Sequence, residues 1–172
     1  MENGRATGFY DALASRYSKR LGILGGDGWL IWSAILAGLA AIVTVVGALL
    51  RLRLNLRQTT VQARASLIQT IQAVLWLVML ACFALWFGKV GDVAAIFYDW
   101  PGPLLIIASS CGLVAAILSV VVVILTPFVW QGGRRVDSFT QGRKLRFTWT
   151  AGVFLLFSVV LAFWGGIFPW AN

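Results

Sequence analysis

The side chains with the greatest chemical capacity in this sequence are basic and gather in two short polar stretches. One stretch follows the first long apolar segment, and the other precedes the last one. Guanidinium and ammonium groups in such places bind the phosphates of anionic lipid headgroups. We therefore expect the basic residues of both stretches to contact lipid headgroups: Arg51, Arg53, Arg57, Arg64, Arg134, Arg135, Arg143, Lys144 and Arg146.

Two glutamines are the next candidates, because Gln69 and Gln72 fall inside an otherwise apolar segment, near Ser66 and Thr70. A carboxamide at membrane depth seeks hydrogen-bond partners, and each bond contributes roughly 0.6–2 kcal/mol there. The pattern indicates a polar clamp between helices, with a substrate-binding site as the alternative. Trp76 lies near the middle of the same segment, and it is interpreted as a packing or lipid-facing residue, with a ligand contact as the alternative.

Patterns for catalysis and metal binding are absent from the sequence. The chain has no histidine and only two cysteines, Cys82 and Cys111, which excludes histidine-ligated haem and cysteine-rich metal sites. No serine stands three residues before a lysine, and no lysine completes a phosphate-binding glycine loop. We expect no catalytic residue, metal or cofactor and no enzymatic activity of this chain alone. The two thiols are interpreted as buried, with a disulfide as the alternative.

Composition indicates a membrane protein. Of 172 residues, 60% are hydrophobic and 12% charged, against roughly 45–50% and about 25% in soluble domains. Four apolar segments exceed the roughly 18 residues that a spanning helix needs. The sequence therefore predicts an all-α bundle of four transmembrane helices, within one domain over 29–172, at 29–50, 67–88, 103–130 and 147–170. Pro127 is expected to kink or end the third helix, and Pro169 the fourth.

The net charge of +8 does not indicate nucleic-acid binding, because the basic residues flank apolar segments and no nucleic-acid motif is present. Membrane lipids and a protein partner in the membrane are expected instead. The basic residues concentrate between the first and second segments and between the third and fourth. The positive-inside rule places these loops in the cytoplasm and both termini outside it, in a membrane expected to be the bacterial cytoplasmic (inner) membrane.

Small residues recur every four positions in three of the predicted helices, where a neighbouring backbone could approach closely. We expect these stripes to mediate helix packing: Ala40, Thr44 and Ala48; Ala108, Gly112 and Ala116; Ser158, Ala162 and Gly166. A large side chain at Gly112 would hold the neighbouring helix away, so Gly112→Leu is expected to destabilise the bundle. Val122 is expected to lie elsewhere on its helix, so Val122→Leu is expected to be neutral.

The N-terminal segment, residues 1–28, is more polar than the rest. Phe9, Leu13, Tyr17 and Leu21 recur every four residues, which predicts a helix over 7–24 lying in the membrane interface. A linker is the alternative for this segment.

The last third of the chain contains Gly133-Arg134-Arg135, then Gly142-Arg143-Lys144-Leu145-Arg146-Phe147-Thr148, and an aliphatic segment that ends in Phe163-Trp164. This stretch of about forty residues resembles the C-terminal membrane tail of bacterial serine β-lactamase-related, penicillin-binding-protein-like hydrolases. The resemblance implies several helices that anchor an exported catalytic domain. The Ser-x-x-Lys motif of that family is missing here, so no catalytic residue carries over.

These features together predict a non-catalytic membrane anchor or accessory scaffold subunit that supports a partner protein or an exported domain. A small carrier or channel for a lipid-like or apolar solute is the alternative, because the four apolar segments contain no charged residue in their central parts.

Overall fold

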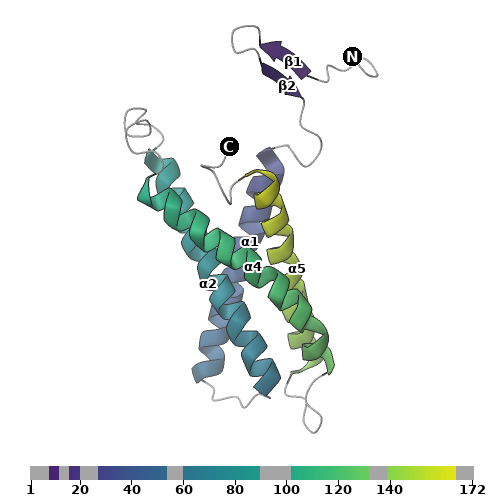
Figure 1. Cartoon of the computed structure of the whole chain (residues 1–172). Helices are drawn as coiled ribbons and strands as arrows, with labels where there is room; N and C mark the ends of the chain where they lie inside the picture. The colour runs from purple at the N-terminus through teal and green to yellow at the C-terminus, as the bar shows by residue number, and fades with distance from the viewer. Residues whose placement is uncertain are drawn as a thin grey trace.

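The computed structural model describes residues 8–11, 16–19, 27–53, 60–89, 102–131 and 139–165. Four long helices dominate it (Figure 1). They are α1 (Asp27–Arg53), α2 (Thr60–Lys89), α4 (Pro103–Gln131) and α5 (Gln141–Phe163). Each contains a stretch long and apolar enough to cross a membrane. The prediction of an all-α integral membrane bundle with four spans is confirmed.

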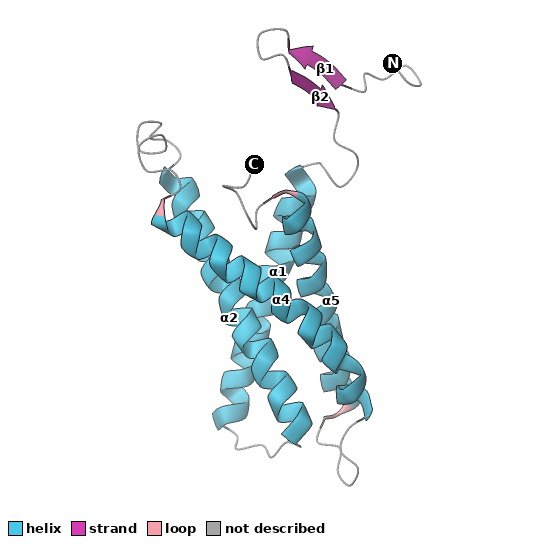
Figure 2. Cartoon of the chain, in the orientation of Figure 1, coloured by secondary structure: helices cyan, strands magenta, loops and turns pink. Residues whose placement is uncertain are grey.

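Two short strands precede the helices, β1 (Gly8–Asp11) and β2 (Arg16–Lys19), and they pair antiparallel with Tyr10 opposite Tyr17 (Figure 2). The prediction of a helix over 7–24 is therefore wrong for these residues. Aromatic residues favour strands, and a few apolar residues at a spacing of four are a weak helical signal over so short a segment. Leu13 and Leu21, which also supported the predicted helix, lie outside the described residues.

Two of the helices begin before their apolar segments do. α2 begins at Thr60 rather than at residue 67, and α5 begins at Gln141 rather than at residue 147. The added turns contain arginine, lysine, glutamine and alanine, which are good helix formers whatever their polarity. Hydropathy marks the part of a helix that suits the bilayer core, and it does not mark where the helix itself begins.

α5 ends at Phe163 rather than at residue 170. The backbone N–H of Trp164 donates to the carbonyl of Val160 and that of Gly165 to the carbonyl of Ala162, both at 3.1 Å. Gly165 has a φ of 68°, a left-handed conformation that glycine adopts at little cost and that commonly stops a helix. Pro169, the predicted stop, lies outside the described residues.

The two prolines of α4 have different positions in the helix. Pro103 is its first residue, where a backbone N–H would have no helical partner. Pro127 lies inside the helix, which continues to Gln131, so termination at Pro127 is wrong. The preceding Thr126 hydroxyl donates to the carbonyl of Val122 at 3.0 Å. Prolines are tolerated in membrane helices because nearby hydroxyls and neighbouring helices satisfy the backbone groups that they disturb.

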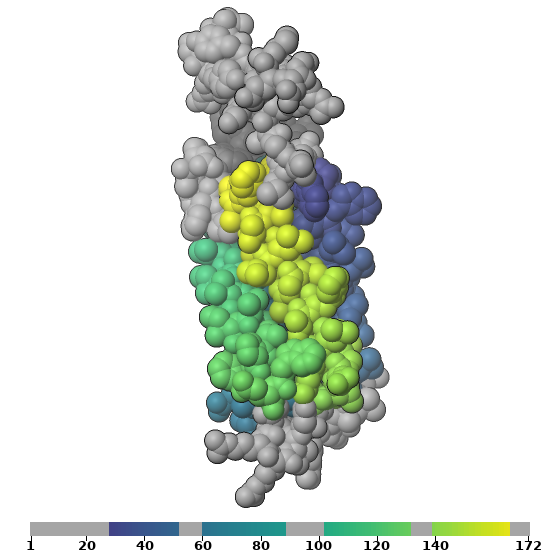
Figure 3. Space-filling view, turned by 90° about the vertical axis from the view of Figure 1, so that its right-hand side faces the viewer, coloured from purple at the N-terminus to yellow at the C-terminus, as the bar shows by residue number. Residues whose placement is uncertain are grey.

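The four helices form a ring in which α1 packs on α2 and α5, and α4 also packs on α2 and α5. The contact between α2 and α4 is the most extensive, and α4 crosses the bundle obliquely (Figure 1). Figure 3 shows α4 and α5 side by side on one face, with α1 at its edge. α1 begins and α5 ends at the same end of the bundle (Figure 1).

Aromatic rings and small residues fill the middle of this ring. Alanines of α1, α2 and α4 pack around Trp76 of α2 and around Phe154 and Phe157 of α5. The ring centroids of Trp76 and Phe157 lie 4.8 Å apart at an interplanar angle of 58°, a favourable tilted geometry. Because α2 and α5 stand diagonally in the ring, this pair occupies its centre.

The outward surfaces of all four helices carry large apolar side chains. Ile31 and Leu39 of α1, Ile124 of α4 and Val159 of α5 each expose more than half of their surface. Such continuous apolar exposure is unfavourable in water and is what a helix presents to lipid. This chain is therefore an integral membrane protein. Trp149, near the start of α5, is 74% exposed, as is typical of the aromatic belt at a membrane interface.

Candidate functional site

Gln69 and Gln72, the residues predicted as a polar clamp, are both buried on α2. The Gln69 amide nitrogen donates to the carbonyl of Phe147 at 3.0 Å and to the hydroxyl of Thr150 at 2.5 Å, both on α5. Since α2 and α5 stand diagonally in the ring, Gln69 joins the bundle across its middle.

Gln72 makes the corresponding contact with α4. Its amide nitrogen donates to the Ser119 hydroxyl at 2.6 Å and, at 3.4 Å, to the carbonyl of Ala115. The Ser119 hydroxyl lies 3.0 Å from the Ser158 hydroxyl of α5. A chain of polar contacts therefore joins α2, α4 and α5 at this level of the bundle.

A third glutamine, Gln62, was not identified from the sequence because it precedes the apolar segment. It is fully buried, and its amide nitrogen lies 3.4 Å from the carbonyl of Val129 on α4, to which it donates. Spacings of seven and three residues place Gln62, Gln69 and Gln72 on one side of a helix. We call these three residues the polar ladder. At roughly 0.6–2 kcal/mol for each bond, the ladder fixes how α2 meets α4 and α5 while apolar packing surrounds it.

Three buried polar atoms have no hydrogen-bond partner among the described residues, namely Gln72 Oε1, Trp76 Nε1 and Ser109 Oγ. Trp76 is completely buried, so it is a core packing residue and not a lipid-facing one. Cys82 and Cys111 are free thiols, partly buried against the same apolar core.

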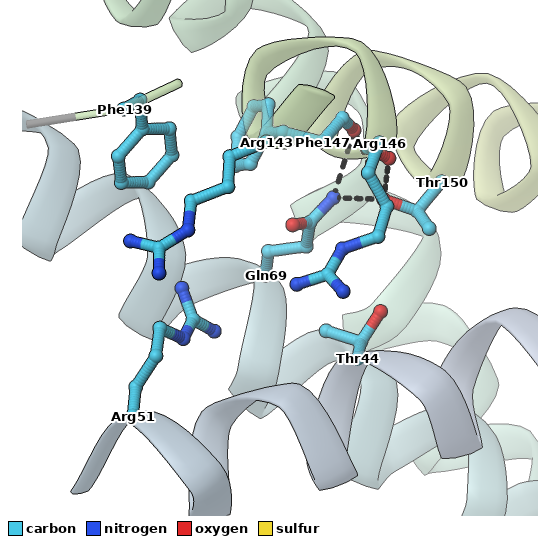
Figure 4. Close-up of a pocket in the computed structure, with 8 residues that line it drawn as sticks. All are labelled: Thr44, Arg51, Gln69, Phe139, Arg143, Arg146, Phe147 and Thr150. Atoms are coloured by element: carbon cyan, nitrogen blue, oxygen red, sulfur yellow. Dashed lines mark hydrogen bonds between the residues drawn. The ribbon is translucent and has the colours of Figure 1, made fainter. Parts of the chain in front are cut away.

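A basic cluster lies where α1 ends and α5 begins. Arg51 of α1 and Arg143 and Arg146 of α5 turn their guanidinium groups toward a common open hollow (Figure 4). We call it the arginine pocket. Its lining is completed by Thr44, Gln69, Phe139, Phe147 and Thr150.

One glycine of α1 positions two of these arginines. Arg51 Nε donates to the carbonyl of Gly47 at 2.9 Å. Arg146 packs against the same residue, because a Cβ added to Gly47 would lie 3.0 Å from Arg146 Nη2. An alanine at position 47 would shift the Arg146 guanidinium by a few tenths of an ångström, and a larger side chain would displace it. The sequence pattern gave Gly47 no role, since its importance depends on how α1 lies beside α5.

The electrostatics of the arginine pocket are one-sided. Arg143 and Arg146 lie close enough to Arg51 for their positive charges to repel its own. None of the residues that line the pocket is acidic. Arg143 also lies in the first turn of α5, which contains no acidic residue and begins after Thr140 without a side-chain cap. That end of a helix carries partial positive charge. The pocket thus combines guanidinium donors with a positive potential.

The other basic residues predicted to contact headgroups have different positions. Lys144 is only 8% exposed, and its ammonium donates to the carbonyl of Trp130 at 3.1 Å. It therefore holds the C-terminal end of α4 to α5, and the headgroup role predicted for it is wrong. Arg64 is exposed on α2. The side chain of Arg53, and all of Arg57, Arg134 and Arg135, lie outside the described residues.

The predicted small-residue stripes meet their neighbours only in part. On α1, Thr44 is buried and Ala40 and Ala48 are half-buried, while Ala37 and Ala41 are the fully buried small residues. Four residues advance about 40° beyond a full helical turn, so a strict spacing of four drifts away from the packed side.

The same drift occurs on the other two helices. Ala108 is fully buried and Gly112 is buried, but Ala116 is half-buried. On α5, Ser158 is buried whereas Ala162 is exposed, so the packing role predicted for Ala162 is wrong within this chain. Gly166 lies outside the described residues. The buried side of α5 is instead dominated by the larger residues Phe147, Phe154 and Phe157.

Gly112 faces both neighbouring helices. A Cβ at this position would lie 3.6 Å from Leu161 Cδ2 and 3.6 Å from Met79 Cγ, which is ordinary van der Waals contact. Val122 is itself completely buried, so Val122→Leu alters a core residue and is not a control outside the packing. Val120, which is 52% exposed, is the valine of α4 that points outward.

In the described part of the chain, no three His, Cys, Asp or Glu side chains gather in a way that could hold a metal ion. Comparisons with family models, with curated proteins and with solved structures found no match to this chain. Function is therefore inferred from the polar ladder, the arginine pocket and the filled interior.

Proposed function

We propose that this chain is a non-catalytic membrane anchor or accessory scaffold subunit that supports a partner protein or an exported domain. The observation that carries the proposal is the filled interior of the bundle. Opposite helices meet at two levels, through the Trp76–Phe157 ring contact and through the hydrogen bonds from Gln69 to α5. A bundle joined across its middle is suited to holding other proteins in a fixed arrangement.

A carrier or channel is favoured less by this interior. A solute that passed along the bundle axis would have to separate Trp76 from Phe157 and Gln69 from Thr150. Breaking the polar contacts costs roughly 0.6–2 kcal/mol each, and parting the rings forfeits packing that contributes about 0.5–1.5 kcal/mol beyond the buried area. Both losses would recur in every transport cycle.

The proposal includes an orientation with both termini outside the cytoplasm, in a bacterial cytoplasmic membrane. It is supported by the basic residues at the end where α1 ends and α5 begins, including Arg51, Arg143 and Arg146. A concentration of basic residues at one end of the spans favours the cytoplasmic side of a bilayer. The arrangement also agrees with the resemblance to hydrolase tails, in which the catalytic domain is exported.

Purification from native membranes in a mild detergent tests the scaffold role. The chain is expected to elute in a complex of fixed stoichiometry with a membrane or exported protein. Val120→Leu, an outward change on α4, is expected to retain that complex. Elution of the chain alone, together with raised solute flux when it is reconstituted by itself into vesicles, would replace the scaffold with a carrier.

A further inference from the structure

The arginine pocket is unusual because its three cationic groups converge from two helices. Arg51 comes from the last turns of α1, and Arg143 and Arg146 come from the first two turns of α5 (Figure 4). Arginines that served only as separate surface charges would lower their energy by pointing apart into water or headgroups. These three instead line one hollow.

The backbone of α1 also leaves room for the Arg146 guanidinium at one particular place. Gly47 leaves the space that Arg146 occupies, with Nη2 3.0 Å from the position of the missing Cβ. Arg51 is held by a hydrogen bond within α1, since its Nε donates to the Gly47 carbonyl at 2.9 Å. That bond uses the inner nitrogen and leaves the two terminal nitrogens of Arg51 available to a ligand.

The polar neighbours of the pocket are already engaged. The Gln69 amide nitrogen donates to α5, and the Thr44 hydroxyl donates to the carbonyl of Ala40 at 2.7 Å. None of the lining residues supplies a carboxylate to balance the three charges. The ligand that suits such a site is a compact anion with several acceptor oxygens, and planar guanidinium groups match phosphate oxygens in pairs.

The depth of the pocket agrees with that chemistry. Arg51 is the last residue of the apolar span of α1, so the pocket lies at the level where a membrane helix leaves the hydrocarbon for the headgroup region. The N-terminal end of α5, where Arg143 lies, adds the partial positive charge of a helix N-terminus.

We propose that the arginine pocket binds one phosphate group, held by Arg51, Arg143 and Arg146. The phosphate belongs either to an anionic lipid headgroup or to a free phosphate compound, and both offer the same oxygens to the site. This binding site goes beyond the scaffold role and does not depend on it.

The test uses the purified full-length chain in detergent, titrated separately with phosphatidylglycerol, phosphatidylcholine and inorganic phosphate. Native mass spectrometry counts the bound molecules, and thermal unfolding measures the stabilisation. Wild type is expected to bind one molecule saturably. Phosphatidylglycerol binding without inorganic phosphate binding identifies a lipid headgroup, whereas inorganic phosphate binding that competes with the lipid identifies a free phosphate compound.

Four variants locate the site. Arg51→Gln and Arg146→Gln are each expected to weaken binding roughly tenfold or more, as loss of a charge-assisted hydrogen bond does. Lys89→Gln removes one positive charge where α2 ends, at the other end of the bundle from the pocket (Figure 1), and it is expected to change the affinity less than threefold. Gly47→Val keeps every charge but fills the space of the Arg146 guanidinium, so it is also expected to weaken binding. Each variant is compared only if it elutes as wild type does.

One acidic residue between α4 and α5, Asp137, lies outside the described residues, so Asp137→Asn is included. If this carboxylate held the arginines, Asp137→Asn would lower stability without added phosphate and would create binding that wild type lacks. That result would overturn the proposal. Absence of saturable binding by wild type, or equal weakening by Lys89→Gln and Arg146→Gln, would overturn it as well.

Discussion

Gly112 allows two substitutions at one position to move stability in opposite directions. The added Cβ of Gly112→Ala would meet Leu161 Cδ2 and Met79 Cγ at 3.6 Å each, which is favourable contact without overlap. Replacing glycine with alanine also raises the free energy of unfolding by about 0.4–1 kcal/mol, because it lowers the conformational entropy of the unfolded chain. Gly112→Ala is therefore expected to stabilise the bundle.

Gly112→Leu should do the reverse. Its three further carbons have to enter space that Met79 and Leu161 already fill, and such overpacking costs about 1–3 kcal/mol. At roughly 2–4 °C for each kcal/mol in a chain of this length, Gly112→Leu should lower the melting temperature by several degrees. Val120→Leu, outward on the same helix, adds a methylene and should leave it unchanged.

The assay is thermal unfolding in one detergent, followed by intrinsic tryptophan fluorescence, because Trp76 is buried in the core. The order of melting temperatures should be Gly112→Ala above wild type and Gly112→Leu below it. A melting temperature of Gly112→Leu equal to that of wild type would mean that α4 does not meet Met79 and Leu161 at this position. The packing described for α2, α4 and α5 would then be incorrect.

Other substitutions and fusions test separate parts of the account. Gln69→Leu should destabilise the bundle by about 0.6–2 kcal/mol in thermal unfolding; Gln72→Leu should cost less, because it also removes a buried carbonyl oxygen without a partner, and the reverse order would contradict the hydrogen bonds assigned to them. Gly165→Ala should lower the melting temperature by the equivalent of about 1–2 kcal/mol, since alanine is strained at a φ of 68°; an unchanged value would show that the turn rearranges freely. A reporter that is active only outside the cytoplasm should be active when fused after Asn172 and silent when fused within 131–141, and the opposite activities would reverse the proposed orientation.

The four spans were predictable because each is a long, continuous apolar segment of the sequence. The central parts of the apolar segments lack charged residues, and lipid leaves a chain few structures other than helices. The helix ends were less predictable. α2 and α5 continue into polar turns that hydropathy does not register, and α5 ends at a glycine, Gly165, whose conformation is a backbone property.

Single residues of the site were predictable, but their convergence was not. Gln69 and Gln72 stood out because amides are costly in hydrocarbon without partners. Arg51 and Arg146 were recognised as basic residues of two different loops, whereas their meeting in one pocket depends on α1 packing beside α5. Gly47 could have been noticed only with that packing known. The pairing of β1 with β2 was not predictable from the apolar repeat, which favoured a helix. In the structure the strand propensity of residues such as Tyr10 and Tyr17 outweighs that repeat.

Thiol accessibility in intact membranes tests most directly the central claim that the interior of the bundle is closed. Cys82 and Cys111 would first be replaced by alanine. A membrane-impermeant maleimide, offered from each side in turn, should leave Ala73→Cys and Ala115→Cys unmodified until the protein is denatured, since both alanines are completely buried. Arg64→Cys, at the exposed start of α2, should be modified readily from one side. Modification of either interior cysteine at a rate comparable to that of Arg64→Cys would reveal an aqueous path through the bundle and contradict the scaffold account.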